Sequence, residues 1–163
     1  MIEIKEYQPK FQKGITDLIT YIQQIEFGVP VKLEDQPDLL DIANFYQKQN
    51  GNFWCAVTEE DEVVGTIALI DVDESFGTIR KMFVKAEYRG KDKGIAALLF
   101  QNLEKEAIQN QMTALYLGTF NKLKASHRFY EKNGFEPISA DFLPKQFPRM
   151  RVDDTFYMKA LKP

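Results

Sequence analysis

The first fifty residues follow two hydrophobic periods. Apolar and polar side chains alternate over Ile2–Tyr7, which predicts a short strand. Apolar residues then recur every three or four positions over Phe11–Phe27, which predicts a helix that ends at Gly28. A second helix is predicted over Asp38–Gln49, and Gly51 lies in the turn that follows it.

Three apolar segments rich in β-branched residues come next. They cover Phe53–Thr58, Val63–Val72 and Gly77–Val84, and short polar turns separate them. Strands joined by such short turns pair antiparallel, so the segments predict a three-stranded meander.

The second half of the chain alternates between helical and extended patterns. The predicted order is a helix over Lys93–Gln109, a strand over Ala114–Thr119, a helix over Lys122–Asn133, a packed loop over Pro137–Asp154 and a strand over Thr155–Leu161. A strand, a helix and a strand joined in this way form a right-handed parallel crossover. We therefore expect an α/β fold with a mixed sheet, in which an antiparallel meander adjoins one parallel crossover and helices cover both faces.

Composition limits the class of protein. A chain of 163 residues with 44% hydrophobic and 28% charged residues is typical of one globular domain, here residues 1–163. No apolar run approaches the roughly 18 residues of a membrane span, and the N-terminus lacks a signal-peptide pattern, so we expect a cytoplasmic protein. A net charge of −3 disfavours nucleic acid as a partner. With one Cys and one His no zinc cluster can be assembled, no metal is expected, and Cys55 is interpreted as a core residue.

The charge is uneven along the chain. Between Arg80 and Lys93 there are six basic residues and two acidic ones, and the segment ends in a turn with two glycines before a predicted helix. Backbone N–H groups at a helix start, with basic side chains beside them, suit a phosphate group. Neither the Rossmann fingerprint nor the P-loop is present. A solvated charged face with a structural turn explains the same residues, and both interpretations remain open at this point.

Two segments carry a family resemblance. The turn V-K-A-E-Y-R-G-K-D-K-G-I-A-A-L-L, Val84–Leu99, is similar to the cofactor motif of the GNAT superfamily of acetyl-CoA-dependent N-acetyltransferases. The pattern [RQ]-x-x-G-x-[GA] falls on Lys91–Ala96, with Lys in place of Arg or Gln at its first position. The segment A-S-H-R-F-Y-E-K-N-G-F, Ala125–Phe135, resembles a second element of the family, and the order of predicted elements agrees over nearly the whole chain.

The resemblance implies a cofactor site for acetyl-CoA. One strand lends its backbone to the pantetheine arm, the glycine turn takes the pyrophosphate, and a gap between that strand and Leu115–Gly118 holds the thioester. The residues implied are Met82, Phe83, Val84, Arg89, Gly90, Lys91, Asp92, Lys93, Gly94, Ile95, Ala96, Asn121, Ala125 and Phe129.

The resemblance also suggests a catalytic group. Tyr130 matches the general-acid position, where a phenol donates a proton to the departing thiolate. Without the resemblance, Phe129 and Tyr130 are equally well explained as core aromatics, and the single His127 as structural. The general base cannot be identified from the sequence. The acidic residues near the candidate strand are Asp71, Asp73, Glu74 and Glu87.

The acceptor is the least defined part of the site. In this family the region between the first two helices often lines the acceptor pocket, and here it carries the acidic residues Glu34, Asp35, Asp38 and Asp41, of which Glu34 and Asp35 are the candidates for binding the acceptor. These acids would suit an amine acceptor with a second positive charge, although helix capping and solvation explain them equally well. The expected function is acetyl transfer to the primary amine of a small molecule or peptide by direct attack in a ternary complex. The alternative is a CoA-binding domain without turnover, and a homodimer is left open.

Overall fold

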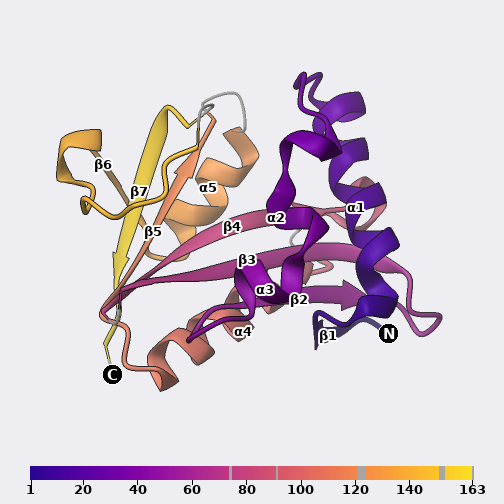
Figure 1. The fold of residues 1–163 in the computed structure, drawn as a ribbon, viewed down its shortest axis with the longest axis horizontal. Helices are drawn as coiled ribbons and strands as arrows, with labels where there is room; N and C mark the ends of the chain where they lie inside the picture. Colours follow the sequence, from indigo (N-terminus) through magenta and orange to yellow (C-terminus); the bar gives the residue numbers. More distant parts are fainter. Residues whose placement is uncertain (74, 91, 121–123, 151–152, 163) are drawn as a thin grey trace.

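The computed structural model describes residues 1–73, 75–90, 92–120, 124–150 and 153–162. Its centre is a seven-stranded mixed sheet with the order β1-β2-β3-β4-β5-β7-β6 (Figure 1). The strands are β1 (Glu3–Glu6), β2 (Asn52–Val57), β3 (Val63–Asp73), β4 (Phe76–Val84), β5 (Ala114–Thr119), β6 (Glu136–Ile138) and β7 (Thr155–Ala160). All neighbouring strands pair antiparallel except β4 and β5, which are parallel.

Helices cover both faces of this sheet. One face carries the 3₁₀ turn η1 (Pro9–Phe11), α1 (Gln12–Tyr21), the π-helical segment η2 (Ile22–Glu26), the 3₁₀ turn η3 (Leu33–Asp35), α2 (Pro37–Leu40) and α3 (Ile42–Tyr46). The other face carries α4 (Ile95–Gln109) and α5 (Lys124–Lys132). Two further 3₁₀ turns are η4 (Ala86–Tyr88) and η5 (Ala140–Phe142). The predicted mixed sheet, meander and parallel crossover are confirmed.

Each face has its own hydrophobic core. Ile15 and Ile19 of α1 and Leu39 of α2 pack with Phe53 of β2 on one side, and Cys55 is fully buried among them, as predicted. Burial raises the pKa of the Cys55 thiol to about 12, so the thiol is inert at neutral pH. On the other side Leu99 of α4 packs against Leu115 of β5.

Two predicted elements differ from the observed ones. The predicted helix over Asp38–Gln49 is broken at Asp41, whose backbone has φ −148° and ψ 60°. The Asp41 carboxylate accepts hydrogen bonds from Asn44 Nδ2 at 3.0 and 3.1 Å, a local contact that competes with helical continuation. The predicted loop over Pro137–Asp154 overlaps the end of the edge strand β6, in which Pro137 pairs with Tyr157. Proline is tolerated there because an edge strand needs N–H donors on one side only.

Other boundaries moved by a few residues. The helix predicted from Lys93 begins at Ile95, because Gly94 takes the left-handed conformation with φ 62°. The helix predicted to end at Phe27 becomes π-helical over Ile22–Glu26. In the part of the chain that the structure describes, no helix has the length and apolar character of a membrane span.

Candidate active site

The turn before α4 presents backbone donors to one point. Gly90 has φ 120° and Gly94 has φ 62°, conformations that L side chains rarely adopt. The Gly90 carbonyl accepts from the N–H groups of Lys93 and Gly94, both at 3.2 Å, which closes the turn. Among the described residues no side chain caps α4, so the first N–H groups of this 15-residue helix point outward with its positive dipole end. This geometry fits an anion.

The basic residues of the turn are bonded to the protein. The two terminal nitrogens of the Arg89 guanidinium, Nη1 and Nη2, donate to the Glu26 carboxylate at 2.7 and 2.9 Å, and Arg89 Nε donates to the Val84 carbonyl at 2.7 Å. Lys93 Nζ donates to the Glu87 carbonyl and lies 5.7 Å from the centre of the Tyr88 ring. Asp92 is exposed, and the predicted Lys91 lies outside the described residues. Backbone N–H groups are therefore the main donors that the described turn offers to an anion.

Strands β4 and β5 separate soon after they meet. They pair only through Phe76, Gly77 and Thr78 of β4 with Ala114–Tyr116 of β5. Beyond Thr78 the side of β4 that faces β5 has no strand partner among the described residues, and this edge includes the predicted Met82–Val84. An unpaired strand edge can bind the amide groups of an extended ligand. The gap expected from the resemblance is present, and we call it the fork.

An irregularity in β4 lies beside the fork. The register with β3 shifts between Thr66 and Ala68, and Lys81 takes a left-handed φ of 53°. Thr66 Oγ1 donates to the Lys81 carbonyl at 2.7 Å and fixes this bulge. A left-handed lysine within a strand is a costly conformation of the kind that gathers at functional sites.

Tyr130 comes from α5 on the α4 side of the sheet. Its ring is buried between Phe129, Phe135 and Tyr157, at centroid distances of 5.9, 5.7 and 5.8 Å. Burial, with a smaller contribution from Asp153, raises the pKa of Tyr130 far above its ordinary value. The phenol therefore keeps its proton at neutral pH.

Other predicted residues of this region are placed in part. Phe129 packs at the edge of the α4-side core, and the backbone of Ala125 belongs to α5. The predicted Asn121 lies outside the described residues. His127 Nε2 is 3.1 Å from the Phe120 carbonyl oxygen, and its ring packs on Tyr157, which agrees with a structural role.

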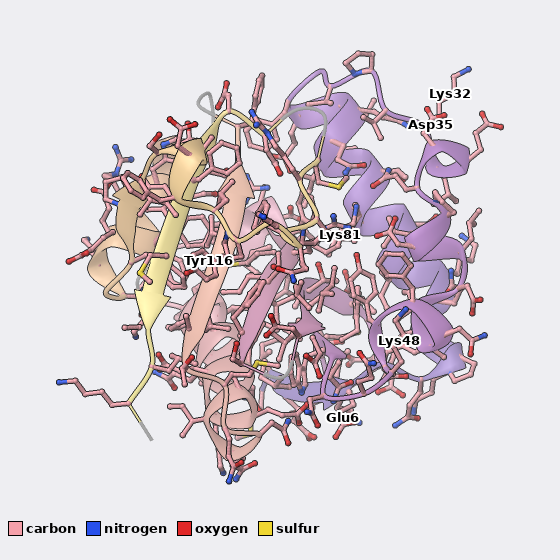
Figure 2. All side chains as sticks on the ribbon, turned by 60° about the vertical axis from the view of Figure 1, so that its left-hand side comes forward. Glu6, Lys32, Asp35, Lys48, Lys81 and Tyr116 are labelled. Atoms are coloured by element: carbon pink, nitrogen blue, oxygen red, sulfur yellow. The ribbon has the colours of Figure 1, made fainter. Side chains whose placement is uncertain are left out.

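A buried polar cluster lies on the opposite face, and of its members the sequence singled out Asp38 as an acidic residue of the segment between the first two helices but did not predict its partners. Lys81 Nζ donates to Gln36 Oε1 at 2.7 Å and lies 3.5 Å from Asp38 Oδ2, and only 6% and 9% of the Lys81 and Asp38 side chains are exposed. Tyr46 donates its hydroxyl to the same Asp38 oxygen at 2.5 Å. Gln36 exchanges side-chain hydrogen bonds with Gln23 at 2.8 and 3.1 Å. In Figure 2 Lys81 lies near the middle of the molecule, between the α2–α3 region and β5.

Two more charged groups adjoin this cluster. Arg80 Nη2 donates to the Pro148 carbonyl at 2.6 Å. Asp153 accepts from the Met150 N–H at 2.9 Å, and its carboxylate lies so close to Gly118 of β5 that a Cβ there would collide with it. Burial raises the pKa of Asp153, and the charge of Arg80 opposes that effect. The sequence held one clue, since two consecutive cations interrupt the apolar strand T-I-R-K-M-F-V.

The acidic residues suggested by the sequence have local roles. Asp35 is exposed and accepts from the Lys32 N–H at 3.2 Å, and Glu34 is exposed beside it. Figure 2 shows Lys32 and Asp35 at the rim of the molecule, away from Lys81. The predicted acceptor residue Asp35 is therefore not part of the cluster around Lys81.

The candidate bases also lie in local contacts. Asp71 accepts from the Asn50 N–H at 3.2 Å, and Asp73 from the Ser75 N–H at 2.9 Å. Glu87 is exposed and forms a 3.7 Å ion pair with Lys85. Glu74 lies outside the described residues. The general base is therefore not assigned.

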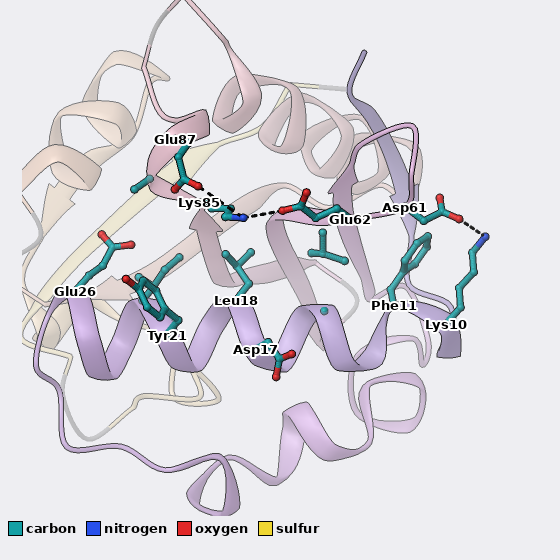
Figure 3. Close-up of a pocket in the computed structure, with 14 residues that line it drawn as sticks. Lys10, Phe11, Asp17, Leu18, Tyr21, Glu26, Asp61, Glu62, Lys85 and Glu87 are labelled. Atoms are coloured by element: carbon teal, nitrogen blue, oxygen red, sulfur yellow. Dashed lines mark hydrogen bonds and ion pairs between the residues drawn. The ribbon is translucent and has the colours of Figure 1, made fainter.

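A cavity of about 490 Å³ lies elsewhere, between α1 and the strand ends around Val63 and Lys85 (Figure 3). Its charged lining is largely paired, because Lys10 binds Asp61 at 3.1 Å and Lys85 binds Glu62 at 2.7 Å. Neither Tyr130 nor Lys81 lines this cavity, so we do not assign it to the reaction. Among the described residues there is also no group of three or more His, Cys, Asp or Glu side chains suited to a metal ion.

The mixed sheet opens into a fork, and a glycine turn precedes α4. Both features are those expected of the acyltransferase fold that the sequence resembles. The model of the Acetyltransferase (GNAT) family matches residues 17–135, so the chain belongs to that family.

Similar proteins agree with this assignment. A crystal structure of a GNAT-family acetyltransferase from Staphylococcus aureus is 34% identical, with a TM-score of 0.94 over 99% of this chain and 100% of that one. N-acetylaspartate synthetase from Xenopus tropicalis is 38% identical over 103 residues, which are 62% of this chain and 37% of that protein. The chain thus matches little more than a third of its curated relative's length. N-acetylglutamate synthase from Neisseria gonorrhoeae, solved with coenzyme A and N-acetyl-glutamate, shares the fold at 15% identity and a TM-score of 0.77, over 100% of this chain and 36% of that one.

The buried ion pair yields a stability prediction. Asp38→Ala leaves the Lys81 ammonium buried without its carboxylate, and loss of one partner of a buried pair typically costs about 3–5 kcal/mol. We expect a loss of that size in the free energy of unfolding, measured by urea denaturation. Asp17→Ala is the control, because it removes the acid of the exposed Lys13–Asp17 pair and should cost far less. Equal losses in the two variants would contradict the buried charge.

Proposed function

We propose that this protein transfers the acetyl group of acetyl-CoA to a primary amine. The observation that carries the proposal is the alignment of the Gly94 turn with the fork. The turn offers backbone donors for a pyrophosphate, and the unpaired edge of β4 adjoins it. Met82 and Val84 of this edge pack against the core cluster that also contains Tyr130. Membership of the GNAT family supports the same reaction class.

The residues present fit acetyl-CoA. Gly90 and Gly94 keep the turn free of Cβ atoms where the backbone must approach the pyrophosphate, and Ile95 and Ala96 supply the first N–H groups of α4. Thr78 Oγ1, where strand pairing ends, is buried without a hydrogen-bond partner among the described residues, as a polar ligand group beside it would explain.

The remaining contacts are assigned by resemblance. Met82, Phe83 and Val84 would pair with the pantetheine arm, and Asn121, Ala125 and Phe129 would line its thiol end. Arg89, Lys91, Asp92 and Lys93 would surround the phosphates. When bound, acetyl-CoA supplies the thioester carbonyl that the amine attacks.

Tyr130 would provide the proton that the reaction needs. Direct attack requires a neutral amine, and the departing sulfur must gain a proton as the C–S bond breaks. The buried phenol retains its proton and, among the described residues, donates it to none, so it is available to the thiolate. The attacking nitrogen sheds one proton after the C–N bond forms, and that proton returns through water to the Tyr130 oxygen, so the step balances and the phenol is restored.

The acceptor in this proposal is the amine of a small molecule. The relative from Xenopus tropicalis is named for the acetylated amino acid that it makes. An amino-acid amine is therefore the first class of acceptor to test, and a peptide amine is the next.

The first prediction concerns the cofactor turn. Gly94→Glu adds a side chain at a left-handed position and a negative charge at the expected pyrophosphate site, so acetyl-CoA binding should be lost in isothermal titration calorimetry. Gly28→Glu is the matched control, because Gly28 has φ 61°, lies in another loop and has no atom within 4 Å of the position that a Cβ would take. Wild-type affinity in Gly94→Glu would show that the turn is wrongly assigned.

The second prediction concerns Tyr130. Tyr130→Phe keeps the buried ring and removes the proton donor, so kcat should fall by about 10²- to 10⁴-fold while acetyl-CoA affinity changes little. Tyr157→Phe serves as the control, since the Tyr157 hydroxyl is already bound to Glu131 at 2.9 Å. An unchanged kcat at saturating amine would remove Tyr130 from the mechanism.

A further inference from the structure

Two consecutive cations, Arg80 and Lys81, lie on β4 beside the fork. The bulge interrupts the alternation of side chains, so both Arg80 and Lys81 interact with the α2–α3 side of the sheet. Tyr130 and α4 lie on the other side. An acceptor that reaches the fork from the α2–α3 side therefore meets these two cations.

The charge of Lys81 is already balanced within the fold. Its ammonium lies 3.5 Å from Asp38 and 2.7 Å from the Gln36 side-chain oxygen, and its side chain is almost fully buried. Lys81 is a fixed part of the wall, and its neutralised charge leaves little demand for an added anion.

The charge of Arg80 is not balanced in the same way. Its guanidinium donates to a neutral group, the Pro148 carbonyl at 2.6 Å, and no carboxylate of the described residues lies within ion-pair distance. A guanidinium has five N–H donors in one plane, and two of them can bind the two oxygens of a carboxylate at once. The nearby Asp153 is directed to the Met150 N–H and to Gly118 instead.

We propose that the acceptor is an amine that also bears a carboxylate, and that Arg80 binds this carboxylate. The inference rests on the proposed acetyl transfer. Glu34 and Asp35, the acids between the first two helices, suggested an acceptor with a second positive charge, but they lie at the surface. The half-buried group beside the fork is a cation, Arg80, which favours an acceptor with a negative charge. Binding of a carboxylate would bring a counter-charge to Arg80 and hold the amine close to the fork.

The test compares acceptors that differ only in this charge. Glycine, β-alanine and L-aspartate are each paired with an amide that has no carboxylate, namely glycinamide, β-alaninamide and the diamide of L-aspartate, and 1,5-diaminopentane represents cationic acceptors. The quantity measured is the ratio of kcat/KM for acid over amide, in the wild type and in Arg80→Gln. Because each ratio is compared between enzymes, differences in intrinsic amine reactivity cancel.

We expect the wild type to use at least one acid as its best acceptor. In Arg80→Gln the acid-to-amide ratio should fall by about 10- to 100-fold, a loss typical of removing a charged hydrogen-bond donor. Arg80→Lys should give a ratio between those of Arg80→Gln and the wild type, since lysine keeps the charge but lacks the planar set of N–H donors. Acetyl-CoA affinity should be unchanged. Arg128→Gln, which removes an exposed arginine on α5, should retain the wild-type ratio.

The possible outcomes distinguish failure of the proposed role of Arg80 from failure of the proposed acetyl transfer. If no amine releases free CoA thiol, the proposed acetyl transfer is wrong. If amines are acetylated but amides or the diamine serve as well as the acids, or the ratio survives in Arg80→Gln, the role of Arg80 is wrong. Should Arg80→Gln not fold, wild-type thermal shifts decide, because β-alanine should raise the melting temperature and β-alaninamide should not.

Discussion

The separation of β4 from β5 is the constraint on which the rest of the site depends. Two parallel strands that pair through three residues and then diverge leave a strand edge without hydrogen-bond partners inside the described fold. Such an edge is costly unless water or a ligand pairs with it. Because α4 follows β4 through a glycine turn, the helix start that we propose for the pyrophosphate lies at the far end of the same edge. Fork, edge and turn therefore form one continuous path.

The two faces of the sheet divide the work of the proposed reaction. On the α4 side Tyr130 is enclosed by aromatic rings, and its burial raises the pKa of the phenol. On the α2–α3 side the bulge at Lys81 turns two cations toward a polar wall formed by Asp38 and Tyr46. In the proposed reaction, Tyr130 and the surface proposed to bind the acceptor therefore lie on opposite faces of the sheet.

The sequence predicted the sheet well because its signals were local. Apolar periodicity identified the strands and helices. The short turn between β3 and β4 indicated antiparallel pairing, and the helix between β4 and β5 indicated parallel pairing. The broken helix at Asp41 escaped prediction because one side-chain contact with Asn44 outweighed a helical pattern. Strand β6 was not predicted because it is short and contains a proline, so it has no strand pattern of its own. It is defined by its pairing with β7.

The candidate site could be predicted only where a motif marked it. The glycines of the turn and Tyr130 lie in such motifs, whereas the Lys81–Asp38 pair joins residues that are far apart in the sequence. Its formation depends on a bulge, and a strand that reads as regular gives no sign of one. The linker acids illustrate the converse, since Asp35 is conspicuous in the sequence and is used in the fold to close η3.

The most direct test of the central claim is steady-state release of free CoA thiol from acetyl-CoA by the wild-type protein with a panel of primary amines. The account predicts thiol release that depends on the amine and is matched one-to-one by an acetylated amine in mass spectrometry. Tight binding of acetyl-CoA with no amine-dependent release across amino acids, peptides and diamines would contradict it.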